Sequence, residues 1–140
     1  MKNKKVIVDN NPIYLEPEDW GSKFWYTIES VILSMDFSDI NSIENTYLFM
    51  VSLQHILPCP TCREHYQKYL EEKNIQKYFE SKRKLFYWIF KLQNEIKTRN
   101  GEKLVPNFEY YLRDVYKKLK VEEINNLLVE DKLRNYRILD

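Results

Sequence analysis

The sequence predicts an all-α fold, a bundle of four amphipathic helices followed by a short fifth helix. Only 2 of the 140 residues are Gly, and no run of alternating apolar and polar residues is bounded by turn signals. One short extended piece, Val6–Val8, is the exception. Apolar residues instead recur three and four residues apart along most of the chain. A chain of this length forms one domain with a substantial core.

The first two helices are expected from the spacing of their apolar residues. The first starts near Pro17 to Trp20, and its apolar residues at helical spacing are Phe24, Trp25, Ile28, Val31, Ile32 and Met35. The second starts after Asn41 or Ser42 and ends at Pro58, and its apolar residues are Tyr47, Leu48, Val51, Leu53 and Ile56.

Three further helices follow. The third runs from Pro60 to about Leu70, with Tyr66 and Tyr69 also on its apolar side. Ser81 caps the fourth, which ends before Gly101 and carries Leu85, Phe86, Trp88, Ile89, Leu92 and Ile96. Asn107, after Pro106, opens a short fifth helix that carries Tyr111, Leu112 and Val115.

The helical domain is expected to span residues 17–118, between an N-terminal extension (1–16) and a charged, partly helical and peripheral tail (119–140). The chain has no internal repeat and no linker that would divide this domain. No stretch approaches the roughly 20 apolar residues that span a bilayer, and the N-terminus lacks the apolar stretch of a signal peptide. The net charge of +1 gives no sign of nucleic-acid binding. We therefore expect a soluble protein that starts inside a cell.

Cys59 and Cys62 are the chain's 2 cysteines, and they form a Cys-Pro-Thr-Cys sequence at the expected start of the third helix. Pro60 suits the first helical position, and the three-residue spacing places both sulfurs on one face. The free N–H groups of that turn, the helix dipole and the Arg63 cation are expected to favour the thiolate, which is the nucleophile in disulfide exchange. Two cysteines are too few for a secreted disulfide scaffold, so the pair indicates redox chemistry or metal binding.

Two other interpretations of the pair stay open. Free cysteines can be small buried hydrophobes, although packing requires neither this spacing nor a helix start. Zinc is the second alternative, because His55, Cys59, Cys62 and His65 are all of zinc-ligand type. These four residues lie close together in the sequence, whereas structural zinc sites usually draw pairs of ligands from two separated segments.

Three blocks of sequence follow one another between Trp20 and Tyr116. They are Trp20-Gly21-Ser22-Lys23-Phe24-Trp25, then Pro58-Cys59-Pro60-Thr61-Cys62-Arg63-Glu64-His65-Tyr66, then Phe86-Tyr87-Trp88 with Leu92-Gln93-Asn94-Glu95-Ile96. In order and spacing the blocks resemble the Erv/ALR family of FAD-linked sulfhydryl oxidases, and most closely its branch from large DNA viruses that replicate in the cytoplasm. The resemblance implies a four-helix bundle with a short fifth helix, usually a homodimer, that holds FAD at the mouth of the bundle.

The resemblance also implies a role for each matching residue. Cys62 would pass electrons to the flavin, and Cys59 would meet the substrate or shuttle thiol. The implied cofactor-binding residues are Trp20, Gly21, Ser22, Trp25, Glu29, His55, Gln93, Asn94, Ile96, Lys97, Arg99 and Lys103. Aromatic residues suit the isoalloxazine ring, and cations suit the pyrophosphate.

The chain departs from the family pattern at several of these positions. Glu29 and Gln93 stand where most members carry histidine, Lys97 replaces an asparagine, and one extra residue precedes Lys103. A carboxylate near the FAD phosphates would repel them unless it turns outward or pairs with a lysine. These departures predict weaker or rearranged FAD contacts.

The resemblance implies that the protein oxidises thiols in two half-reactions. A substrate dithiol exchanges with the Cys59–Cys62 disulfide, and electrons then pass through the flavin to oxygen, giving hydrogen peroxide. Since the chain lacks a second cysteine pair, the expected partner is a thiol-containing protein substrate or a thioredoxin- or glutaredoxin-like shuttle. The expected location is the cytoplasm of an infected cell or the virion, with the mitochondrial intermembrane space as the alternative.

Two functions of other classes stay open. The chain can be a flavin-less paralogue whose bundle serves as a dimeric interaction module, or a small zinc-binding helical adaptor. The colour of the purified protein separates them from an oxidase, because only bound flavin makes it yellow.

Overall fold

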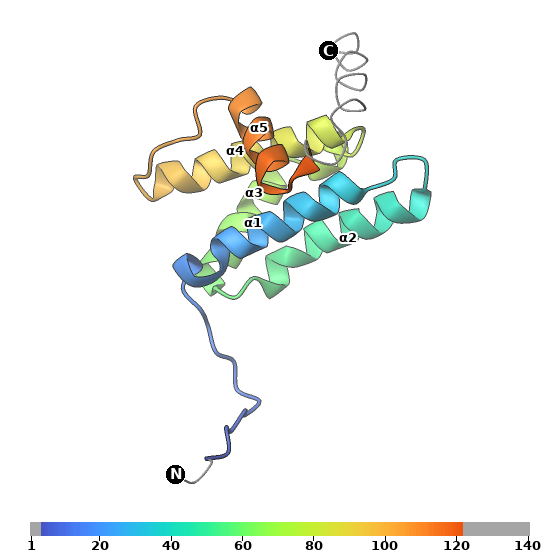
Figure 1. The fold of residues 1–140 in the computed structure, drawn as a ribbon. Coiled ribbons are helices and arrows are strands. Elements are labelled where there is room, and N and C mark those ends of the chain that lie inside the picture. Colours follow the sequence, from blue (N-terminus) through green and yellow to red (C-terminus); the bar gives the residue numbers. More distant parts are fainter. Residues whose placement is uncertain (1–3, 122–140) are drawn as a thin grey trace.

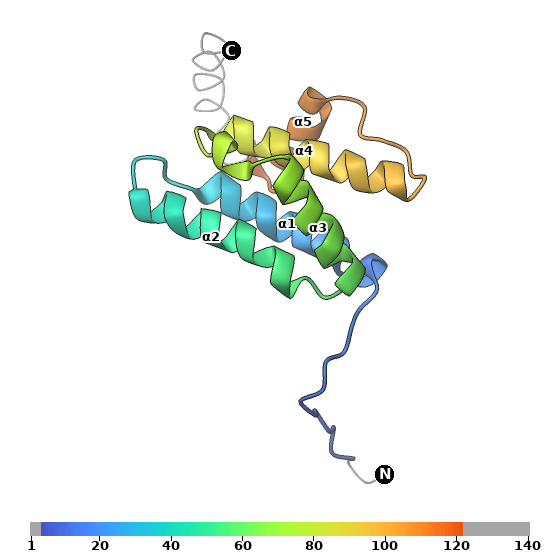
Figure 2. The same cartoon turned by 180° about the vertical axis from the view of Figure 1, so that it is seen from behind.

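The computed structural model describes residues 4–121 of the chain. The elements follow in the order α1 (Pro17–Ser34), α2 (Ile40–Ile56), α3 (Pro60–Glu72), the 3₁₀ helix η1 (Ile75–Tyr78), α4 (Lys82–Arg99) and α5 (Phe108–Lys118). Helices α1 and α2 lie side by side as an antiparallel pair (Figure 1). Helix α4 packs against both α1 and α5. Figure 2, seen from behind, shows α3 crossing in front of α1. The predicted all-α fold is confirmed for the described residues.

The helices begin and end where local sequence signals place them. Asp39, Ser81 and Asn107 are N-caps, and the side chain of each accepts a backbone N–H of the first turn. Because Asp39 takes the cap, α2 begins at Ile40, slightly earlier than predicted. Gly101 follows the end of α4 with φ of +68°, a left-handed conformation that glycine adopts without a steric penalty.

Two short segments differ from the sequence prediction. The connection between α3 and α4 contains η1, which Asn74 caps and which buries Ile75 to 2% exposure. Its four residues are too few to show a helical period. At the N-terminus, Val6–Val8 form no strand and are at least 86% exposed. The predicted helical content of the tail falls largely on residues 122–140, which lie outside the described residues.

The core fixes α3, and with it the cysteines, against the other helices. Trp88 is 1% exposed, and its indole Nε1 donates to the Lys73 carbonyl at 2.8 Å. The Tyr69 ring meets the Trp88 ring edge-on at 4.9 Å, and its hydroxyl donates to the Trp88 carbonyl at 3.1 Å. Tyr66 donates its hydroxyl to the Met50 carbonyl at 2.5 Å. These bonds tie α3 to both α2 and α4.

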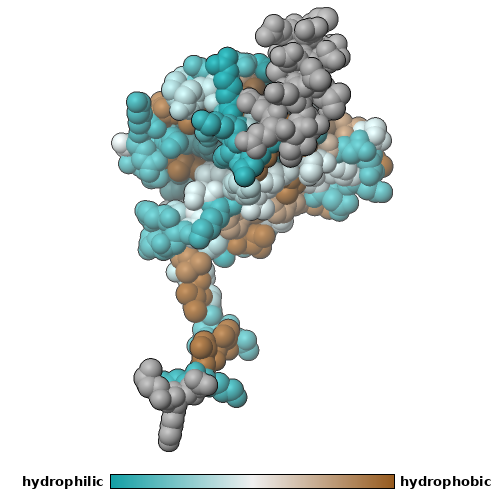
Figure 3. Space-filling model, viewed as in Figure 1, coloured by the Kyte–Doolittle hydropathy of each residue, from teal (hydrophilic) through white to brown (hydrophobic). Residues whose placement is uncertain are grey.

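The N-terminal segment projects away from the helices (Figure 1). Its apolar side chains form brown patches on the surface in Figure 3, and Ile13 is 78% exposed. Within residues 4–121, no helix combines the length and the apolar character needed to cross a membrane.

Candidate active site

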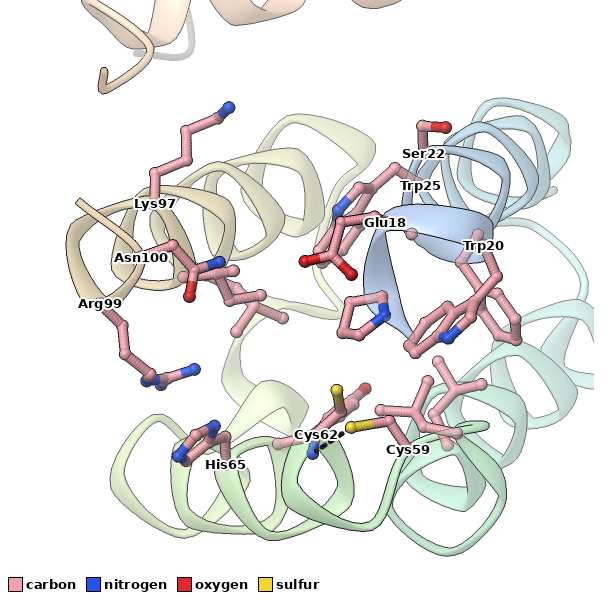
Figure 4. A pocket seen from close by; sticks show the side chains of 18 of the residues that line it. Glu18, Trp20, Ser22, Trp25, Cys59, Cys62, His65, Lys97, Arg99 and Asn100 are labelled. Carbon is pink, nitrogen blue, oxygen red and sulfur yellow. Dashed lines mark hydrogen bonds between the residues drawn. The ribbon is translucent and has the colours of Figure 1, made fainter. Parts of the chain in front are cut away.

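A cavity of about 680 Å³ lies at the end of the bundle where α1 and α3 begin and α2 and α4 end (Figure 4). This volume is typical of small-molecule sites. Its apolar and aromatic lining includes Trp20, Phe24, Trp25, Ile28, Met50, Leu53, Leu57, Tyr66, Ile89, Leu92 and Ile96. Its polar lining includes Glu16, Glu18, Ser22, Cys59, Thr61, Cys62, His65, Lys97, Arg99, Asn100 and Glu102.

The two cysteines stand at the first turn of α3, on the wall of this cavity (Figure 4). Cys59 is the N-cap, and its Sγ accepts the backbone N–H of Cys62 at 3.3 Å. Pro60 occupies the first helical position, as predicted. Both sulfurs are free thiols in the structure, and both residues are half-buried. The dithiol therefore opens into a largely apolar cavity from a rigid helix start.

The surroundings of Cys62 favour its neutral thiol. Burial, reinforced by the hydrogen bond and charge of Cys59, raises the pKa of the Cys62 thiol to about 12. The helix-start N–H and the Arg99 guanidinium act in the opposite direction, but more weakly. The prediction that the helix start favours the thiolate is therefore wrong for Cys62, because desolvation is the larger effect.

Arg63 is not the cation that acts on this thiol. Its Nε donates to the Leu57 carbonyl at 2.6 Å, and its guanidinium lies 5.7 Å from the centre of the Tyr14 ring. Next to Tyr14, the Leu15 N–H donates to the Pro58 carbonyl at 3.0 Å. Arg63 therefore holds the loop before the cysteines and contacts the end of the N-terminal segment that adjoins α1. The predicted activating role belongs instead to Arg99, from α4.

The structure brings many of the predicted site residues to the cavity. They are Trp20, Gly21, Ser22, Trp25, Cys59, Cys62, Ile96, Lys97 and Arg99. Trp20 and Trp25 come from α1, whereas Lys97 and Arg99 come from the end of α4 across the cavity (Figure 4). Direct contact between these residues and a cofactor stays a prediction.

Glu29 and Gln93 do not line the cavity but contact each other inside the bundle. Glu29 is fully buried, and its Oε2 accepts a hydrogen bond from Tyr111 at 2.6 Å and a longer one from Gln93 at 3.4 Å. Its Oε1 forms an ion pair with the Lys118 ammonium group. The carboxylate therefore pairs with a lysine, which is one of the two arrangements that the sequence allows for a charge at this position.

Three other predicted residues also lie outside the cavity lining. Asn94 uses both polar atoms of its side chain on Val105, accepting from its N–H at 2.9 Å and donating to its carbonyl at 3.2 Å. It thereby fixes the connection between α4 and α5. His55 is exposed on α2, and Lys103 is exposed in that connection. Their cofactor contacts stay predictions.

The cavity also contains residues that the sequence did not assign to a cofactor or catalytic site. His65 stands one turn after Cys62 on α3, and that spacing was a signal available in the sequence. Glu18 extends its carboxylate into the cavity from α1, opposite the cysteines (Figure 4). Asn100 follows the end of α4. No local signal indicates the last two, because packing of separate helices brings them to the cavity.

The geometry gives no support to a zinc site. Within residues 4–121, no group of three His, Cys, Asp or Glu side chains is placed to hold a metal ion. His55 is exposed on α2, whereas Cys59, Cys62 and His65 line the cavity. The four side chains considered as zinc ligands therefore do not converge.

Comparison with known proteins agrees with the geometry. The model of the Erv1 / Alr family matches residues 23–117. A protein of Invertebrate iridescent virus 3, 096R, is named as a FAD-linked sulfhydryl oxidase, and it is 27% identical over 86 residues. This match covers 61% of the chain and 58% of the viral protein, so it spans less than two thirds of that relative. No solved structure matches the chain. Because the family model covers most of the chain, including α3 with both cysteines, the protein belongs to the Erv1/Alr family.

Proposed function

We propose that this protein is a FAD-dependent thiol oxidase that uses Cys59 and Cys62 to form disulfides in partner proteins. One observation carries the proposal: a dithiol at a helix start opens into a largely apolar, aromatic cavity large enough for a cofactor. Membership of the Erv1/Alr family and the name of the viral relative support it.

The chemistry of the cavity lining fits FAD. Trp20 and Trp25 offer flat apolar surface of the kind that an isoalloxazine ring requires. Lys97 and Arg99 offer cations for a pyrophosphate, and Glu102 pairs with Lys97 at 3.7 Å on the same side. When bound, FAD would supply a two-electron acceptor next to the dithiol.

The cysteines would act by thiol–disulfide exchange. A substrate thiolate attacks Sγ of Cys59 in the Cys59–Cys62 disulfide, the S–S bond breaks, and Cys62 leaves. A second substrate thiolate then attacks the mixed disulfide, so that the substrate gains a disulfide and the protein holds two thiols. Cys62 leaves as a thiolate and, because its pKa is raised to about 12, takes up a proton that the substrate thiols have released. Its electrons would go on through the flavin to oxygen, giving hydrogen peroxide.

The partners and location belong to the same proposal. Because the chain has only 2 cysteines, its partner would be a thiol-containing protein substrate or a thioredoxin- or glutaredoxin-like shuttle. We expect a homodimer, since exposed apolar side chains such as Tyr26 on α1 and Leu48 on α2 offer a surface for a second copy. The viral relative favours a site of action in the infected cytoplasm or the virion over the mitochondrial intermembrane space.

The visible spectrum of the purified full chain tests the proposal. A flavin band should bleach on addition of dithiothreitol under air and recover while oxygen is consumed. Cys62→Ser should keep the colour and lose turnover, whereas Gln67→Ala, an exposed change on α3, should keep both. A colourless protein that consumes no oxygen even with added FAD would contradict the proposal. It would favour the interaction module, and a metal assay would then test the zinc adaptor.

A further inference from the structure

Of the 2 histidines in the chain, His65 lines the dithiol cavity and His55 does not. His65 stands three residues after Cys62 on α3, so the two side chains share a helix face with about 5–6 Å between their Cβ atoms. Figure 4 shows both on the cavity side of α3. We propose that His65 accepts the proton that Cys62 loses when the dithiol is oxidised, directly or through one water. This inference rests on the proposed thiol oxidase function.

Cys62 needs a proton acceptor because its surroundings favour the thiol. Oxidation of the two thiols to a disulfide releases two electrons and two protons, and each S–H bond must break as the S–S bond forms. The electrons would go to the flavin, the Cys62 proton would go to a ring nitrogen of His65, and the proton of the half-buried Cys59 would go to solvent. Apolar side chains such as Ile89, Leu92 and Ile96 line the same cavity and offer no proton acceptor. His65 is half-buried, so it can pass the proton on to solvent.

The surroundings of His65 keep its imidazole neutral and able to accept a proton. Burial lowers the pKa of His65, and the Arg99 guanidinium lowers it further. Arg99 extends from α4 toward His65 (Figure 4), and the same cation stabilises a thiolate at Cys62. Arg99 therefore keeps the resting imidazole neutral and favours the charge that forms on sulfur, and its repulsion of the imidazolium favours onward release of the proton to solvent. The other charged groups that act on His65 are Glu64 and Lys68 from α3 and Glu95 from α4, while Glu18 from α1 lines the same cavity.

Alkylation of Cys62 tests the inference without flavin. In the full-length Cys59→Ser variant, the rate of reaction with iodoacetamide should rise in two steps with pH. The first step should follow deprotonation of His65, below the ordinary histidine value of 6.5, and the second should follow ionisation of the thiol. Adding His65→Gln should remove the first step and lower the rate at pH 7 by about tenfold, a modest effect for loss of a general base. His55→Gln is the matched control, because that histidine is exposed outside the cavity, and it should keep both steps.

A first step that survives His65→Gln, or that His55→Gln removes equally, would overturn the inference. NMR titration supplies a readout that does not depend on the stability of a His65 variant. In the Cys59→Ser variant, the His65 imidazole should titrate at the same pH as the first alkylation step, and a clear difference between the two would overturn the inference as well. A colourless protein with two-step alkylation would instead remove the oxidase function while keeping the Cys62–His65 acid–base pair.

Discussion

Tyr111 donates its hydroxyl to the fully buried carboxylate of Glu29 at 2.6 Å and thereby links α5 to α1. Lys118, also on α5, forms an ion pair with the other carboxylate oxygen. A buried charge is tolerated only when it is paired and hydrogen-bonded. Removal of one partner leaves a buried charge that is no longer fully compensated. This cluster therefore makes the docking of α5 sensitive to each of its members.

Removal of the Tyr111 hydroxyl should destabilise the protein. Tyr111→Phe keeps the ring in the core but takes one donor from Glu29, so the free energy of unfolding should fall by about 1–3 kcal/mol. Urea denaturation at pH 7 measures this change. Tyr110→Phe is the control, because Tyr110 is 56% exposed, and it should change stability by less than about 0.5 kcal/mol. Equal effects of the two substitutions would contradict a stabilising role for the buried hydrogen bond.

Stability should fall at alkaline pH because of buried tyrosines. Burial raises the pKa of Tyr66, Tyr69 and Tyr111 above the ordinary value of 10.0, and Glu29 adds to the effect at Tyr111. Above that value the unfolded chain loses protons that the folded chain keeps, so these groups stabilise the fold below pH 10 and less as pH rises further. Urea midpoints between pH 8 and pH 11 should show the decline. In Tyr111→Phe the decline should be shallower, and an unchanged slope would rule out a contribution from this residue.

The two thiols should differ in reactivity. Because the pKa of the Cys62 thiol is raised to about 12, little of it is thiolate near neutral pH, and iodoacetamide should alkylate it at least about tenfold more slowly than Cys59. Mass spectrometry of peptides from the reduced protein, quenched at intervals at pH 8, gives both rates. Protein unfolded in urea is the control, where the rates should converge. Faster modification of Cys62 in the folded protein would be incompatible with the desolvation described for its sulfur.

Asn94 should stabilise the connection between α4 and α5. Asn94→Ala removes both hydrogen bonds to Val105 and should lower the free energy of unfolding by about 1–3 kcal/mol in protein prepared without added FAD. Asn45→Ala is the control, since the Asn45 amide makes an exposed bond to the Asn41 carbonyl on α2 and should contribute less than about 0.5 kcal/mol. If Asn94→Ala changed FAD retention but left this stability unaltered, Asn94 would contact the cofactor and would not stabilise the connection.

Local signals in the sequence were sufficient to predict most of the helix boundaries and the position of the cysteine pair at a helix start. Ser81 and Asn107 cap the helices that they were predicted to cap, and Pro60 opens α3. Caps and first-turn prolines act on backbone groups within four residues, so their effect is visible in a short stretch of sequence. The 3₁₀ helix η1 escaped prediction because one turn carries no period.

Tertiary packing decided the electrostatics of the site. Arg63 adjoins Cys62 in sequence but binds the Leu57 carbonyl, whereas Arg99 reaches the thiol from α4. Similarly, no sequence spacing indicated that Lys118 would pair with Glu29.

The sequence by itself therefore determined the helical fold class, the dithiol at a helix start and the family to which the chain belongs. The tertiary structure alone decided which side chains share the cavity, which cation faces Cys62, and that its thiol is favoured over the thiolate. The physical reason is the distance along the chain over which each interaction acts. Helix caps and spacing act between near neighbours in the chain, but burial and Coulomb interactions depend on segments that only folding brings together.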